Sequence, residues 1–147
     1  MQLTDKKKVL VLVPGAKVGI VMARFNDEIT ARMLGAAEEA LRESKVDAKN
    51  IKVVQVAGCV EIPFALARLA KTHKYDALVA LGCVIRGETP HFDYVCKMAQ
   101  EGILRVSLDE MIPIGFGIIT VNNLEQAQAR IQLGADAVRA AIELVAV

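Results

Sequence analysis

The residues best suited to chemistry lie in the segment 80–94, which reads A-L-G-C-V-I-R-G-E-T-P-H-F-D-Y. This segment begins as an apolar run typical of the end of a buried strand, breaks at Gly87 and resumes as a helix at Thr89 and Pro90. Threonine is a favoured N-cap because its hydroxyl accepts from a free backbone N–H, and proline suits the first helical position because its missing N–H is not needed there. We therefore expect a short polar loop and a helix N-terminus, which together can bind an anion.

His91 falls in the first turn of that helix and would stand beside the anion. It is one of two histidines in the chain, and an imidazole in a cleft is a candidate for moving protons. A capping or packing role is the alternative, and position alone does not decide between the two.

The other predicted strand ends also carry polar or aromatic side chains. Phe25 and Asn26 follow the first strand, Glu61 follows the second, and Phe116 lies in the fourth with Arg130 on the helix beyond. Ligands of open α/β sheets bind beyond the carboxyl ends of the strands. A phenylalanine there can stack on a flat ring or pack in the core. Glu61 suits hydroxyl binding or helix capping, and Arg130 suits phosphate binding or a solvated surface.

Apolar runs and helical periodicity alternate along the chain, so each predicted strand is followed by a predicted helix. Strands are expected over 18–23, 51–56, 76–83 and 114–120, and helices over 27–44, 64–73, 90–108 and 122–147, the last with a candidate break at Gly134. This alternation predicts one domain over 1–147, with a parallel sheet between two layers of helices. The apolar run 9–13 predicts a short edge strand within an N-terminal arm over 1–15.

Charge and hydropathy exclude several classes of partner. The net charge is +1, whereas a nucleic-acid surface needs a basic face. No apolar stretch reaches the length of a membrane span, and no signal-peptide pattern opens the chain. We therefore expect a cytoplasmic protein that binds neither nucleic acid nor membrane.

The cysteines and glycines argue against metal and nucleotide chemistry. Cys59, Cys83 and Cys96 show no C-x-x-C spacing, which indicates reduced thiols and no zinc site. Gly115 and Gly117 form a bare G-x-G inside a predicted strand, without the third glycine or the helix of a dinucleotide site, and no Walker A sequence is present.

The apolar content is high for so small a chain. Apolar residues make up 54% of the sequence without counting glycine, against about 45–50% with glycine in ordinary domains. A single small core cannot bury this excess, which favours extensive contact between subunits.

Four segments together resemble the lumazine synthase (6,7-dimethyl-8-ribityllumazine synthase) family. They are R-F-N at 24–26, G-C-V-E-I-P at 58–63, G-C-V-I-R-G-E-T-P-H-F at 82–92, and F-G at 116–117 followed by L-E-Q-A at 124–127 and Arg130. Each segment is weak by itself. Their shared order and spacing over 18–130 make the resemblance specific.

The resemblance implies a three-layer α/β/α fold with a four-stranded parallel, flavodoxin-like sheet. It also implies an activity in riboflavin biosynthesis: 5-amino-6-(D-ribitylamino)uracil and 3,4-dihydroxy-2-butanone 4-phosphate condense to 6,7-dimethyl-8-ribityllumazine, with release of phosphate and water. The family uses no cofactor and no metal. Its members form homo-oligomers, so a pentamer is implied, and whether such rings close into a 60-subunit shell is left open.

The resemblance also implies roles for individual residues. His91 would transfer protons. Phe116 and Arg130 would come from the neighbouring subunit. The pyrimidine and ribityl chain would be bound by Phe25, Asn26, Cys59, Val60, Glu61, Cys83, Val84, Ile85 and Phe116, and the phosphate by Glu88, Thr89 and Arg130.

One departure from the family pattern stands after Arg130. The family usually has a lysine a few residues further on that contacts the pyrimidine, whereas this chain has no lysine after Lys97. The alternative function is therefore a ligand-binding or shell-forming protein on the same scaffold with weak or no catalysis. The related archaeal-type riboflavin synthase is less similar, because it lacks the G-E-T-P-H pattern.

Overall fold

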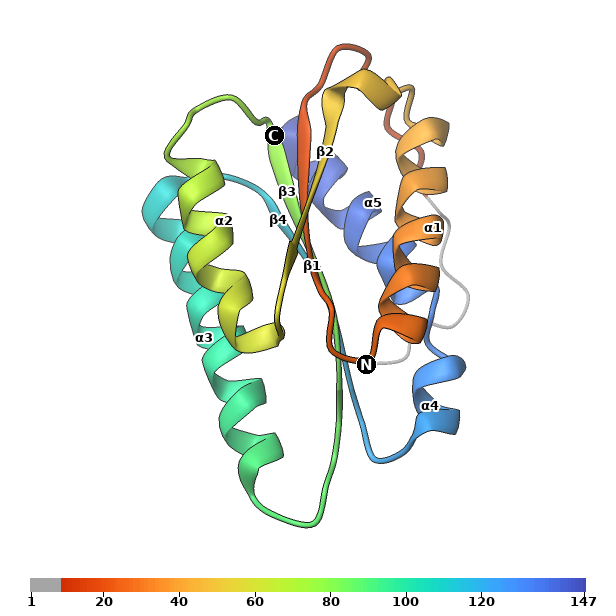
Figure 1. The fold of residues 1–147 in the computed structure, drawn as a ribbon. Helices are drawn as coiled ribbons and strands as arrows, with labels where there is room; N and C mark the ends of the chain where they lie inside the picture. Colours follow the sequence, from red (N-terminus) through yellow and green to blue (C-terminus); the bar gives the residue numbers. More distant parts are fainter. Residues whose placement is uncertain (1–8) are drawn as a thin grey trace.

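The structure, a computed structural model, describes residues 9–147 and contains one parallel sheet (Figure 1). The strand order is β2-β1-β3-β4, and every neighbouring pair is parallel. The strands are β1 (Val18–Ala23), β2 (Ile51–Val56), β3 (Ala77–Ile85) and β4 (Ile114–Val121). This order matches the start of a flavodoxin-like sheet, as expected from the sequence.

Helices cover both faces of the sheet. They are α1 (Asp27–Glu43), α2 (Ile62–Ala70), α3 (His91–Glu110), α4 (Leu124–Gln128) and α5 (Leu133–Val145), with short 3-10 turns η1 (Ala48–Asn50) and η2 (Cys59–Glu61). One core cluster joins α1 and α5 to one face, and a second joins α2 and α3 to the other (Figure 1). The predicted three-layer α/β/α architecture is therefore confirmed. No helix within residues 9–147 is long and apolar enough to cross a membrane.

The two central strands explain the continuous apolar runs of the sequence. Every residue of β1 is buried, and so is all of β3 except Ile85. A strand with helices on both sides has no solvent face, so its side chains are apolar without alternation. The edge strand β2 is only partly covered and retains polar residues such as Lys52 and Gln55.

The carboxyl ends of the strands meet at the lower edge of the sheet in Figure 1. Ala23 pairs with Val56, so β1 and β2 end together, and Ile85 pairs with Val121, so β3 and β4 end together. The last pair between β1 and β3 is Met22 with Leu81, so β3 and β4 extend further than β1 and β2 at the same edge. The segments that lead into α1, α2, α3 and α4 therefore lie along one edge, where the sequence predicts the site.

Several helix boundaries differ from the sequence prediction. The helix predicted over 64–73 is α2, Ile62–Ala70, so it includes Pro63 and ends before His73, and α3 ends at Glu110 and not at 108. The helix α3 begins at His91 with Pro90 as its N-cap, one residue later than predicted, and the Thr89 hydroxyl accepts from His91 N at a long 3.4 Å. The C-terminal helical region breaks between α4 and α5 and not at Gly134, which lies in the first turn of α5. A Cβ on Gly134 would lie 2.5 Å from the carbonyl oxygen of Met33, so this glycine allows α5 to approach α1 closely.

Residues 9–13, predicted as a short edge strand, form no strand within the single chain, and residues 1–8 of the predicted arm lie outside the described residues. Pairing of 9–13 with the sheet of a neighbouring subunit stays a prediction. Val13 N donates to Ser44 O at 2.9 Å, and Val11 packs on the core cluster of α1 and α5. The segment follows the helix layer, so no strand edge of its own sheet lies beside it to pair with. Val9, Leu10 and Leu12 remain more than half exposed, at 56, 62 and 55%.

The close approach of α5 to β4 yields a stability prediction. A Cβ on Gly115 would overlap with the backbone carbonyl of Ala137 in α5. Because backbone cannot move aside as a flexible side chain can, Gly115→Ala should lower the free energy of unfolding by about 1–3 kcal/mol. Denaturant unfolding at one fixed protein concentration measures this change.

Gly35→Ala provides the matched control. Gly35 lies on the exposed side of α1, and no atom of residues 9–147 lies within 4 Å of an added Cβ. Alanine should stabilise the protein there by about 0.5–1 kcal/mol because glycine is the poorer helix former. A Gly115→Ala protein as stable as wild type would contradict the close packing of α5 on β4.

Candidate active site

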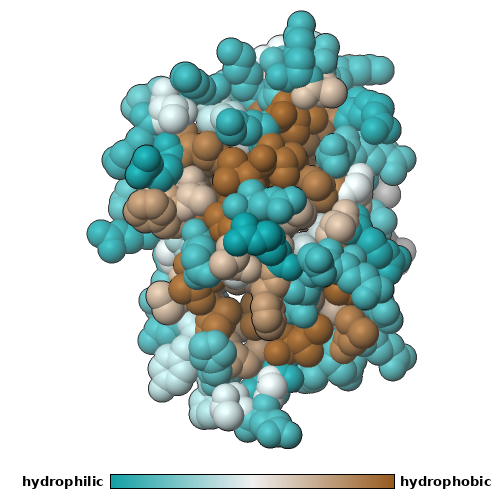
Figure 2. All heavy atoms as spheres, viewed as in Figure 1, coloured by the Kyte–Doolittle hydropathy of each residue, from teal (hydrophilic) through white to brown (hydrophobic). Residues whose placement is uncertain are grey.

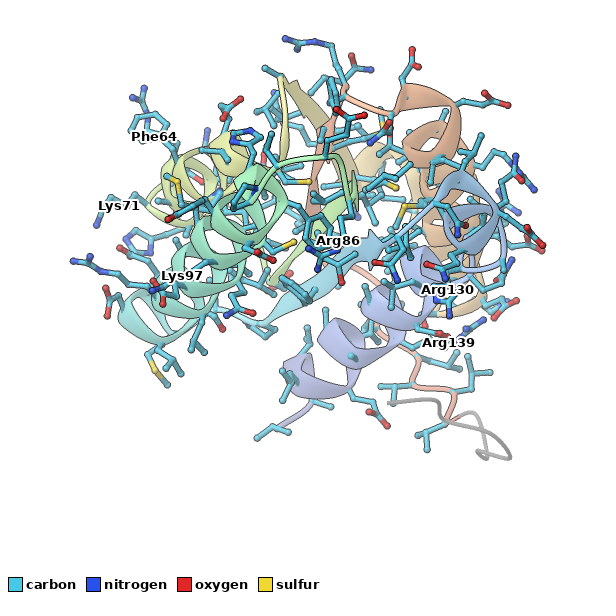
Figure 3. The ribbon with its side chains drawn as sticks, turned by 90° about the horizontal axis from the view of Figure 1, so that it is seen from below. Phe64, Lys71, Arg86, Lys97, Arg130 and Arg139 are labelled. Carbon is cyan, nitrogen blue, oxygen red and sulfur yellow. The ribbon has the colours of Figure 1, made fainter. Side chains whose placement is uncertain are left out.

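A pocket of about 540 Å³ opens at the carboxyl edge of the sheet, between the ends of β1 and β3, the turn η2 and the first turn of α3. Figure 3 looks onto this edge from below. The pocket is lined by Phe25, Gly58, Cys59, Val60, Glu61, Cys83, Val84, Ile85, Gly87, Thr89, His91, Phe92 and Val95. Most of the predicted site residues are therefore brought together by the fold.

Phe25 stands at the mouth of the pocket because of the turn that follows β1. Phe25 N donates to Ala57 O at 3.0 Å, and the side chain is 72% exposed. Asn26 then adopts a left-handed conformation at φ 61°, which asparagine tolerates better than most residues. Its Nδ2 donates to Cys83 O at 2.8 Å, so the amide ties this turn to the end of β3. Asn26 therefore supports the pocket and does not line it.

The two cysteines of the pocket are buried thiols. Burial raises the pKa of Cys59 to about 12 and the pKa of Cys83 to about 11. A thiol with so high a pKa is protonated at neutral pH and is a poor nucleophile. Cys59 Sγ also fills the space that a Cβ on Gly82 would occupy, so a larger residue at 82 would displace the Cys59 side chain. The cysteines therefore form a neutral wall of the pocket.

Glu61, Thr89 and His91 supply the polar groups of the pocket. All three are exposed, Glu61 on η2 and the other two around the start of α3. Within residues 9–147 no hydrogen bond occupies the His91 imidazole, so its nitrogens are available to a ligand. The N-terminus of α3, a helix of twenty residues, points its free N–H groups to the same place.

Four predicted site residues do not line this pocket in the single chain. Besides Asn26, Glu88 is an exposed loop residue. Phe116 is 44% exposed on the edge strand β4, in a groove beside α3 that also contains Gln100 and Ile103. Arg130 lies in a second pocket of about 430 Å³. The roles of Phe116 and Arg130 therefore remain predictions that require a second chain.

The second pocket contains a residue to which the sequence analysis assigned no role. It is lined by Arg86, Phe92, Cys96, Thr120, Val121, Asn122, Gln126 and Arg130. Arg86 is labelled near the centre of Figure 3, with Arg130 on the side of α4. A charged residue directly after a buried strand was the available signal for Arg86. Phe92, also missed, lines both pockets and separates them.

The arrangement suits acid–base chemistry on a flat polar molecule that carries an anionic group. An aromatic face and two neutral thiols can enclose a ring, a carboxylate can accept from hydroxyls, and a helix N-terminus can bind an anion. An unoccupied imidazole beside them can move protons. The fold and the pocket thus define an α/β enzyme whose chemistry is proton transfer between bound small molecules.

Comparison with known proteins identifies the family. The sequence model of the family described as 6,7-dimethyl-8-ribityllumazine synthase matches residues 15–147. A relative of that name from Desulfatibacillum aliphaticivorans is 49% identical over 136 residues, covering 89% of this chain and 88% of the relative. Relatives of the same name from Paracidovorax citrulli and Nitrosospira multiformis are 50% and 51% identical over 128 residues. Each alignment covers 86% of this chain, with 83% and 80% of the respective relative.

The chain belongs to the 6,7-dimethyl-8-ribityllumazine synthase family, and its activity is that of a lumazine synthase in riboflavin biosynthesis. The resemblance found in the four sequence segments is therefore confirmed.

Proposed function

We propose that the pocket at the carboxyl edge of the sheet condenses 5-amino-6-(D-ribitylamino)uracil with 3,4-dihydroxy-2-butanone 4-phosphate. The products are 6,7-dimethyl-8-ribityllumazine, phosphate and two molecules of water. The observation that carries the proposal is the convergence of Phe25, Glu61, Thr89 and His91 on one pocket from three different strand ends. Their side chains match the ring, hydroxyl, phosphate and proton-transfer requirements of this substrate pair.

The two substrates would occupy different parts of the pocket. The pyrimidine would stack on Phe25 against the neutral thiols of Cys59 and Cys83, and the Glu61 carboxylate would accept from ribityl hydroxyls. The phosphate would lie at the N-terminus of α3, near Glu88 and Thr89, where free N–H groups and the helix dipole favour an anion. His91 would then stand between the phosphate and the reacting atoms.

The reaction needs proton transfers and no change of oxidation state. The aryl amine attacks the ketone, and the resulting carbinolamine loses water to form an imine. The phosphate then leaves by elimination, and ring closure releases a second water. His91 would accept and return protons during these steps. Holding both substrates in one pocket would supply much of the remaining rate, because it converts an encounter in solution into a reaction of neighbours.

We further propose that the active site is completed by a second copy of the chain in a pentamer. Phe116 and Arg130 lie outside the pocket of their own chain, on the side of β4 and α4. Apolar surface is exposed on the face that carries the edge strand β2, as Figure 2 shows, and includes Val53 at 37%. Exposed apolar side chains also occur along α3 and at the residue that follows it, namely Tyr94, Met98, Leu104, Leu108 and Met111. Contacts between subunits would remove this surface from water.

We propose a cytoplasmic location, which the three free thiols support. Disulfides persist in oxidising compartments, whereas thiols are usual where glutathione keeps them reduced.

Mixing the two substrates with the purified protein tests the proposed reaction. Lumazine absorbance should rise faster with protein than in the slow reaction of the two substrates alone. Each substrate incubated singly with the protein serves as the control. A protein that binds both substrates and leaves the background rate unchanged would instead be the binding or shell-forming protein that the missing lysine favours.

Sedimentation tests the proposed assembly. The wild-type protein should sediment as a species of at least five chains of 15.9 kDa. Removal of residues 1–13 should weaken the ring, because Val9, Leu10 and Leu12 expose apolar surface that a neighbouring subunit would cover. Activity should fall in parallel with the pentamer fraction, since each site would need residues from two chains. A fully active monomer would refute both the ring and the shared site.

A further inference from the structure

Arg86 follows β3 directly and joins three separate segments at the edge of the sheet. Its backbone N–H donates to Val121 O at 2.8 Å. Its Nε donates to Asn122 Oδ1 at 3.2 Å, and its Nη2 lies 3.6 Å from Asp93 Oδ1. Its Cζ lies 4.4 Å from the centre of the Phe92 ring. One guanidinium therefore ties the end of β3 and the loop after β4 to the first turn of α3.

The loop between Arg86 and α3 has few other anchors. Residues 87–90 are exposed, and no hydrogen bond found within 9–147 joins them to another element. Their bonds are local: Thr89 Oγ1 accepts from His91 N, and Pro90 O accepts from Asp93 N at 2.9 Å. The position of this loop is therefore determined at its two ends, and Arg86 contacts both.

Phe92 transmits this contact from one pocket to the other. Its ring lines the second pocket, on the side of Arg86, and also the substrate pocket, on the side of Thr89 and His91. A guanidinium over a ring face restrains that ring, and the fork of an arginine binds its oxygen partners in a fixed geometry. The contact of Arg86 with Phe92 in the second pocket thus helps to orient Thr89 and His91, which precede Phe92 and line the substrate pocket.

We propose that Arg86 is a positioning residue for the reaction. By holding Phe92 and Asp93, it fixes the first turn of α3 so that His91 and Thr89 face the pocket, while Arg86 itself does not line that pocket. This inference rests on the proposed function, in which His91 moves protons and Thr89 binds phosphate.

Arg86→Met is the direct test, because methionine keeps a long unbranched side chain but lacks the charge and the planar set of N–H donors of the guanidinium. The kcat should fall about ten- to a hundredfold, since small displacements of reacting groups are costly. The KM for the pyrimidine should change little, because Phe25 and Glu61 lie on other segments. Arg86→Lys should recover only part of the kcat, since it restores charge without the fork. Arg105→Met, which removes an ion pair with Asp109 further along α3, is the matched control and should retain wild-type kinetics.

The double variant with His91→Ala separates positioning from a general loss of structure. If Arg86 acts through His91, Arg86→Met should lower the kcat much less in the His91→Ala background than in wild type. Equal decreases in both backgrounds would overturn the inference, and so would a folded Arg86→Met enzyme with wild-type kinetics.

Two milder variants keep the test decisive if Arg86→Met does not fold. Asp93→Asn and Asn122→Ala each remove one partner of Arg86 and should show smaller decreases in kcat with the same dependence on His91. Circular dichroism identifies the folded variants. A wild-type protein that forms no lumazine would refute the proposed function. If the wild type is active but the decreases in kcat caused by the Arg86-related variants are the same with and without His91, only the role of Arg86 is refuted.

Discussion

Replacement of Arg130 by alanine is expected to raise the KM for the phosphate-bearing substrate far more than the KM for the pyrimidine. A hydrogen bond to a charged group contributes about 1.5–3 kcal/mol, which corresponds to roughly a 10- to 150-fold change in affinity. The guanidinium is suited to this task because Arg130 is exposed, and among residues 9–147 only its Nη1 is engaged, donating to Gln126 O at 2.9 Å. The remaining N–H groups are available to a phosphate. Initial-rate kinetics with each substrate varied in turn measures the two constants.

Phe25→Ala is the reciprocal control for Arg130→Ala. Phe25 lines the substrate pocket and would stack on the pyrimidine ring, so its loss should raise the KM for the pyrimidine and spare the other substrate. If Arg130→Ala affected the pyrimidine alone, the proposed phosphate contact would be wrong.

Mixed oligomers test whether Arg130 acts in the site of a neighbouring subunit. Chains with Arg130→Ala retain His91, and chains with His91→Ala retain Arg130. When the two proteins are unfolded, mixed and reassembled, a shared site pairs an intact His91 with an intact Arg130 at some junctions. Activity should therefore recover above that of either variant alone. A mixture with no recovery would indicate that each chain uses its own Arg130.

Replacement of His91 by alanine is expected to lower the kcat by up to about a hundredfold, near the low end for general acid–base residues. The imidazole lines the pocket at the start of α3, and no hydrogen bond within the described residues occupies it. Both substrates should still bind, because Phe25, Glu61 and the N-terminus of α3 are unaffected. The rate gained from proximity should therefore survive the change.

His73→Asn is the matched control for His91→Ala. His73 is the other histidine of the chain and lies exposed after the C-terminal end of α2, away from the pocket. Asparagine suits its left-handed conformation, at φ 56°, better than alanine would. The control should have wild-type kcat and KM. An unchanged kcat in folded His91→Ala would remove His91 from the mechanism.

Local sequence patterns were sufficient for the four strands of the sheet and for the order of strands and helices. The strands predicted over 18–23 and 51–56 match β1 and β2 in full. A strand that is buried on both faces consists of apolar residues, whereas an edge strand also contains polar ones, so the residue types indicate each strand. The predicted start of α3 differs from the observed one by one residue, and Asn123 caps α4 with its Oδ1, which accepts from Gln126 N at 2.9 Å. Capping involves residues that are close in sequence, so it can be predicted from the sequence alone.

The sequence by itself determined the alternation of strands and helices, the edge at which the site forms and most of the residues that line it. Tertiary structure decided which of those residues meet. It directed the amide of Asn26 to Cys83 O, separated Arg130 from the pocket of its own chain, and joined Arg86 to Phe92 and Asn122. It also left residues 9–13 along the helix layer and not in a strand. The reason is that periodicity reports how a residue is buried, whereas its partners depend on contacts between segments far apart in the chain.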